Sequence, residues 1–131
     1  MDGMARLERI VGRLPEAERV DVAEWGDHPT FRVRGKNFVF CDADARHLTV
    51  KLPKEEAAAV VAEDAGAEPA GYGLGRHGWV AVTVADDSGG DSAAAGDERW
   101  RQVEEWVRTS YTMVAPRGLA ARVAAEDEAA R

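Results

Sequence analysis

Residues 30–52, TFRVRGKNFVFCDADARHLTVKL, decide the fold. Short runs rich in β-branched and aromatic residues are separated there by turn-forming residues, which is the pattern of consecutive β-strands. Apolar and polar residues alternate over 30–34 and again over 47–52, while 37–41 is more fully apolar. Both connections between these runs are too short for the crossovers that parallel strands require, so the strands are predicted to pair antiparallel.

Helices are predicted on both sides of these strands. Met4, Leu7, Ile10, Val11 and Leu14 form an apolar stripe at nearly helical spacing before Pro15. The predicted elements are a helix over 4–14, a strand near 20–25, strands over 30–34, 37–41 and 47–52, a helix opened by Pro53, a strand over 79–85, a helix from about Asp97 to 115 and a last helix over 117–126. This order predicts an α+β two-layer sandwich, in which helices pack on one face of a mainly antiparallel sheet.

The composition is that of a globular protein with an excess of acidic residues. The 131 residues are 45% hydrophobic, and 24 acidic against 17 basic residues give a net charge of −7. We expect one domain over 1–131, with a flexible loop at 86–96 and a polar tail at 127–131. Cys41 is the only cysteine and cannot form an internal disulfide. Without an apolar leader or a long apolar run, the chain is expected to be a cytoplasmic monomer that does not enter membranes.

None of the catalytic motifs has the context that its chemistry requires. Residues 73–78, GLGRHG, match G-x-G-x-x-G, but a strand rather than a helix is predicted to follow them. This segment either holds a single phosphate through its amides and Arg76 or only connects two elements. The three histidines lack the spacing of a metal site, and Cys41 lies in an apolar strand, where a cysteine is usually a core residue. We therefore predict no enzymatic activity, no cofactor and no metal site.

Positive charge is concentrated in the predicted hairpins. Residues 31–54 contain six basic and two acidic residues, whereas residues 56–96 contain one basic and seven acidic residues. Strand alternation places the cations Arg32, Arg34 and Lys51 on the face opposite the core, together with Trp79. Such a face can bind an anionic polymer, because cations neutralise phosphates and an indole stacks on a base. Polar outer faces are also common in antiparallel sheets, so the pattern alone leaves both interpretations open.

Several segments together resemble the MmcQ/YjbR family of small bacterial proteins. They are WGDHPTFRV at 25–33, GKNF at 35–38, GWV at 78–80, SY at 110–111 and VAPR at 114–117. The resemblance as a whole extends from about Arg6 to Leu119. It implies a CyaY-like α+β fold and a double-wing domain that lays its sheet on DNA. The nucleic-acid-binding residues that it implies here are Arg32, Arg34, Lys36, Lys51, Arg76 and Trp79.

Two other classes of function remain open from the sequence. One is a non-enzymatic domain that binds a protein partner or a small anion through the same cations. The other is metal handling in the manner of frataxin-like folds, which the mixed charges of the first helix do not favour. With an acidic chain and only a few cations, DNA binding is expected to be weak and sensitive to salt.

Overall fold

The computed structural model describes residues 3–23, 28–71, 73–84 and 93–129, and its centre is a six-stranded sheet. The strands are β1 (Ala17–Val22), β2 (His28–Val33), β3 (Lys36–Cys41), β4 (His47–Lys51), β5 (Ala67–Pro69) and β6 (Trp79–Thr83). They lie in the order β1-β2-β3-β4-β6-β5, and every neighbouring pair is antiparallel. The predicted antiparallel sheet is confirmed.

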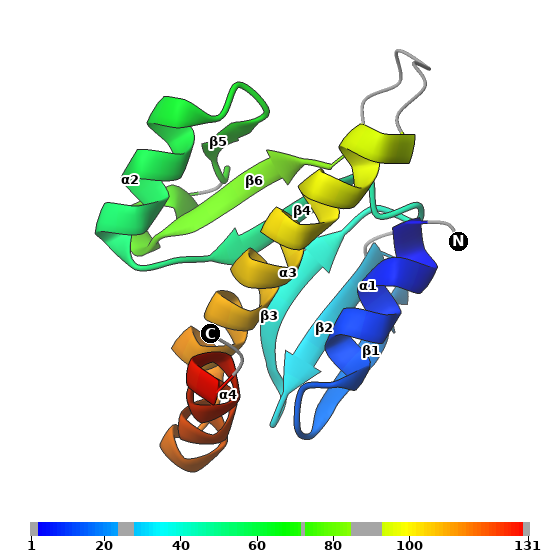
Figure 1. Ribbon diagram of the computed structural model, residues 1–131, viewed down its shortest axis with the longest axis vertical. Coiled ribbons are helices and arrows are strands. Elements are labelled where there is room, and N and C mark those ends of the chain that lie inside the picture. The colour runs from blue at the N-terminus through cyan, green and yellow to red at the C-terminus, as the bar shows by residue number, and fades with distance from the viewer. Residues whose placement is uncertain (1–2, 24–27, 72, 85–92, 130–131) are drawn as a thin grey trace.

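Four α-helices complete the α+β fold (Figure 1). They are α1 (Gly3–Gly12), α2 (Lys54–Glu63), α3 (Ala93–Val114) and α4 (Arg117–Ala129), and a 3₁₀ helix, η2, covers Leu74–His77. Helices α1 and α3 cross the same face of the sheet, α4 folds back beside the end of α3, and α2 lies next to β5 and β6. No helix in the described part of the chain is long and apolar enough to cross a membrane.

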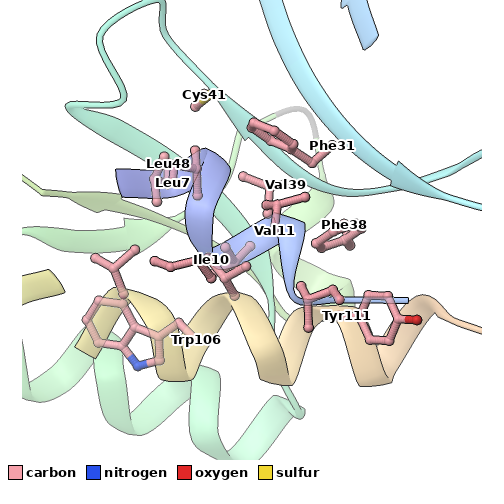
Figure 2. Packing of buried hydrophobic residues seen from close by; sticks show 14 of the residues in the cluster. Leu7, Ile10, Val11, Phe31, Phe38, Val39, Cys41, Leu48, Trp106 and Tyr111 are labelled. Carbon is pink, nitrogen blue, oxygen red and sulfur yellow. The ribbon is translucent and has the colours of Figure 1, made fainter. Parts of the chain in front are cut away.

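All four helices bury side chains in one core on the inner face of the sheet. Leu7 and Val11 from α1 meet Phe31, Val39 and other strand residues there, as Figure 2 shows. The remaining core residues from the other helices include Ala57, Val103, Trp106, Tyr111, Leu119 and Val123. The alternation predicted for β2, β4 and β6 is confirmed, because its inward residues are almost fully buried.

A register shift in β3 sends Phe40 to the outer face. The pairing of β2 with β3 shifts between Phe31 and Arg32, which is a β-bulge, and Phe38 and Val39 are both buried as a result. Ser110 of α3 fills the gap next to this bulge. Its hydroxyl donates to the Phe38 carbonyl over 2.6 Å and accepts from the Lys51 amide over 2.8 Å, so one side chain bridges β3 and β4.

Gly78 holds the start of β6 against the end of β4. Its φ of +89° lies in the left-handed region, and a Cβ at this position would lie 2.2 Å from the carbonyl oxygen of Leu52. The Leu52 amide donates to the Gly78 carbonyl over 2.9 Å. This close contact explains why glycine precedes Trp79 in the sequence.

Several predicted boundaries were wrong. Helix α3 begins at Ala93, so residues 93–96 of the predicted loop are helical, and α4 continues through Ala129 into the predicted tail. The last residues of the predicted turn at 26–29 belong to β2, and the short elements β5 and η2 were not predicted. Trp25 and the rest of that turn, residues 86–92 of the predicted loop and the last two residues of the tail lie outside the described residues.

Candidate nucleic-acid interface

The outer face of the sheet carries side chains in three rows across the strands. Strand register defines each row, because residues paired between neighbouring strands point to the same face. Near the β2–β3 turn Arg32 pairs with Glu18 and Asn37, and Lys51 pairs with Trp79; the central row contains Val20, Thr30, Phe40, Thr49, Ala81 and Glu68; at the other end Val22 pairs with His28 and His47 pairs with Thr83.

Cations gather in the row nearest the β2–β3 turn. Arg32 and Lys51 are partly exposed there, and Lys36 is exposed at the start of β3. Glu18 lies opposite Arg32 in the register and reduces the local excess of positive charge. Arg32 Nε and the side-chain oxygen of its other register partner, Asn37, are buried and make no hydrogen bond in the described structure. These two atoms form an unsatisfied donor and acceptor beside the cations.

Phe40 at the centre of the face and Trp79 beside the cations form an aromatic pair. The rings of Phe40 and Trp79 meet edge to face, with centroids 5.4 Å apart and an interplanar angle of 62°. Beside this pair lies a hollow of about 750 Å³. Its lining includes Phe40, Thr49 and Ala81 of the sheet, Ala70 and Gly71 after β5, and Leu74 of η2.

Two histidines stand at the end of the face away from the cations. His28 Nδ1 donates to the Cys41 carbonyl over 3.3 Å, and His47 Nδ1 lies 2.8 Å from a carboxylate oxygen of Asp42. Burial opposes ionisation of Asp42, but hydrogen bonds from His47 and from two backbone amides lower the pKa of this carboxyl. Among the described residues, no three histidine, cysteine or acidic side chains lie close enough together to hold a metal ion.

Cys41 is a core residue, as the sequence analysis expected. Its side chain is buried, and its sulfur lies 3.9 Å from the Pro29 carbonyl oxygen. Burial raises the pKa of the thiol to about 12, so almost none of it is thiolate at neutral pH.

Arg34 does not lie on the outer face, contrary to the sequence interpretation. Strand β2 ends at Val33, and Arg34 and Gly35 occupy the turn with φ values of +51° and +81°. The Arg34 guanidinium binds both carboxylate oxygens of Glu16, over 2.6 and 2.9 Å. This pair lowers the pKa of Glu16 and raises that of Arg34, so the charge of Arg34 is already compensated within the chain.

Arg76 belongs to η2 and not to a strand of the sheet. It lines an apolar hollow between η2 and α2, together with Lys54, Pro69 and Trp79. The 3₁₀ helix is followed by β6 and not by an α-helix, so the glycine motif lacks the strand–helix context of a dinucleotide site. Of the predicted residues, the structure places Arg32, Lys51 and Trp79 on the outer face, whereas Lys36 pairs with the inward-facing Val33.

The described part of the WGDHPTFRV segment holds β2 to its neighbouring strands. Thr30 is fully buried and donates its hydroxyl to the Val20 carbonyl over 2.6 Å, which ties β2 to β1. Phe31 points into the core, and His28 ties the start of β2 to β3. The segment thus fixes the position of Arg32 between two strands.

A second basic surface, which the sequence analysis did not predict, lies in the groove between α1 and α3. Arg6, Arg9, Arg13 and Arg101 line it with Trp100 and two acidic residues, and its volume is about 420 Å³. Arg6 binds Asp97 over 2.6 Å, and Arg13 lies 4.0 Å from Glu104. These ion pairs compensate part of the charge. The outer face of the sheet has an aromatic pair beside its cations, so it remains the better candidate for binding a base.

The chain forms a small α+β domain. The outer face of its antiparallel sheet is cationic at one end and aromatic at its centre. The sequence model of the YjbR family matches residues 12–113, and the chain belongs to this family. No curated protein matches the chain. No solved structure matches it either, so the CyaY-like arrangement stays a prediction.

The sequence analysis missed Phe40 and the hollow beside it. Residues 38–41 are all apolar, so alternation does not show which of these side chains face outward. The bulge decides this, and its signal in the sequence is the run Phe38, Val39 and Phe40 beside alternating neighbours. A backbone hydrogen bond of Ser110 was expected and is confirmed, but its bridge between β3 and β4 depends on contact between residues far apart in the chain.

Proposed function

We propose that this protein binds DNA weakly and without catalysis, through the cationic row on the outer face of its sheet. The observation that carries the proposal is that Arg32 and Lys51 share one face of the sheet with the Phe40–Trp79 pair. Cations neutralise phosphates, and aromatic rings give bases a surface on which to stack.

The acidic surroundings limit the affinity that this surface can provide. The chain carries a net charge of −7, and Glu18 lies opposite Arg32. With two cations contacting phosphates, the logarithm of the affinity for duplex DNA should fall with the logarithm of salt concentration with a slope of about −2. The complex should therefore be measurable only at low salt.

The test is a fluorescence-anisotropy titration of duplex DNA from about 50 to 200 mM salt. The double variant Arg32→Ala/Lys51→Ala should bind more weakly and reduce the magnitude of the salt slope by about two. The control is Arg117→Ala/Arg122→Ala, which changes the net charge equally through exposed residues of α4. The proposal is wrong if duplex and single-stranded DNA of varied sequence give no anisotropy change at low salt, or if both double variants lose affinity equally.

A further inference from the structure

The hollow at the centre of the outer face is large enough to admit a nucleobase and has a lining that suits one. Its volume of about 750 Å³ lies within the range of small-molecule sites. We propose that it takes a single unstacked base of single-stranded DNA, which stacks on Phe40; this inference rests on the proposed function and names its preferred ligand.

The lining of the hollow suits a planar, partly polar ring. Phe40, Ala81 and Leu74 supply apolar surface, and Thr49 and His28 bring a hydroxyl and an imidazole to the same space. The contact between His28 Nδ1 and the Cys41 carbonyl fixes the tautomer, so Nε2 of the neutral ring is left as an acceptor. A base offers both donors and acceptors at its edge, which these groups can pair with.

Trp79 holds the Phe40 ring in place before any ligand arrives. The edge-to-face contact at 5.4 Å fixes the orientation of the two rings across β4. A ring whose position is already fixed loses little conformational entropy on binding, so more of the stacking free energy contributes to affinity.

The charges around the hollow orient the nucleotide. Lys51 lies two residues from Thr49 on the same strand and face, about 7 Å along the chain. Asp42 lines the adjoining hollow at the end away from the cations, and Glu68 lines it beside Ala81. Phosphates are attracted towards Lys51 and repelled from these carboxylates, so the base extends from Lys51 into the hollow.

A base inside a duplex cannot occupy this site. Its two ring faces are already stacked on neighbouring pairs, and only its edge is accessible in the grooves. A base that is unpaired, or that has been rotated out of the helix, offers a ring face for stacking on an aromatic side chain. The hollow therefore favours single-stranded DNA, whereas the cationic row alone would bind either form.

The experiment compares three DNA probes at one ionic strength. They are a short oligothymidylate strand, an abasic strand of equal length and charge, and a duplex of the same length. Stacking of one base predicts that oligothymidylate binds about tenfold more tightly than the abasic strand. The variant Ala81→Leu, which fills the hollow without a change of charge, should remove this preference.

The matched control is Ala59→Leu, which adds the same side chain at an exposed position of α2 and should leave the preference unchanged. Phe40→Leu gives a second test, since it keeps apolar volume in the sheet but removes the ring. Equal binding of the abasic and thymidylate strands, or a preference that survives Ala81→Leu, overturns the base site while the DNA-binding proposal stands. If none of the three probes binds at low salt, the proposed function and the base site are both wrong.

Discussion

On the inner face of the sheet Val33, Val39 and Val50 are fully buried, whereas Arg32 and Thr49, which directly precede two of them in the chain, are partly exposed on the outer face. The two faces are built from the same strands and differ in what covers them. Four helices bury the inner side chains, while the outer face has a hollow and the segment between β5 and η2.

This difference separates the residues that hold the fold from those that are available for binding. Each buried valine contributes about 1.5–3 kcal/mol to folding through removal of apolar surface from water. An exposed side chain on the outer face contributes much less, so it can change without loss of the fold. The same kind of substitution should therefore change the free energy of unfolding more on the inner face than on the outer face.

The largest expected difference involves two hydroxyl groups. Ser110→Ala leaves the Phe38 carbonyl and the Lys51 amide without their shared partner, and should lower the free energy of unfolding by about 3 kcal/mol, since each unsatisfied buried group costs about 1–3 kcal/mol. Thr49→Ala removes a hydroxyl from the outer face and should change this free energy by less than about 1 kcal/mol. Urea denaturation of both variants measures the difference.

Equal losses in the two variants would contradict the assignment of Ser110 as a bridge between β3 and β4. Ser110→Thr is a useful control, because it keeps the hydroxyl and adds one methyl group in a fully buried position. It should cost stability through crowding, yet leave the amide of Lys51 protected from hydrogen exchange. In Ser110→Ala the same amide should exchange faster.

The strands and their pairing were predictable because their sequence signals are local. Alternation over 30–34 and 47–52 reports directly which side chains face the core, and short connections force antiparallel pairing. Strand β5 has only three residues and forms through its pairing with β6, so its own sequence carries no comparable signal. The start of α3 was misplaced because small residues at 93–96 resemble a loop in composition.

The candidate site was only partly predictable because its geometry depends on two local departures from regular strands. The predicted strand was one residue too long, and its alternation therefore placed Arg34 on the outer face. In the structure the chain turns at Arg34, and the guanidinium binds Glu16. The bulge has the opposite effect and brings Phe40 outward from a run that looks like core. Lys51 and Trp79 were correctly grouped on one face because β4 and β6 are regular at these positions.

A smaller effect on stability is expected where the helical layer is tied to the edge of the sheet. Arg99 of α3 binds both carboxylate oxygens of Asp64, donates to the Thr83 carbonyl over 2.7 Å and lies 5.1 Å from the Trp106 ring centre. The hydrogen bond from Arg99 lowers the pKa of Asp64 below its ordinary value. Asp64→Asn should lower the free energy of unfolding at neutral pH by about 1–2 kcal/mol.

The sign of the pH dependence follows from the lowered pKa. The Asp64 carboxylate contributes its full stability above the pKa of the unfolded chain, and this contribution is lost as the pH falls through the lower pKa of the folded state. The native protein should therefore lose more stability between neutral and strongly acidic pH than Asp64→Asn does. Parallel losses in thermal or urea unfolding at several pH values would show that the pair does not contribute.

The smallest expected effects on stability and DNA binding concern Arg34. The sequence analysis predicted this cation on the outer face, but in the structure it lies in the turn. Arg34→Asn removes the exposed pair with Glu16 but gives the turn a residue that favours a positive φ before glycine. We expect little change in stability and no change in DNA affinity or salt slope.

Lys51→Asn removes the same charge from the outer face and should reduce the magnitude of the slope by about one. Anisotropy titrations of both variants over a range of salt concentrations make the comparison. An equal loss of slope in Arg34→Asn would mean that total charge, rather than the arrangement of cations on the sheet, controls DNA binding.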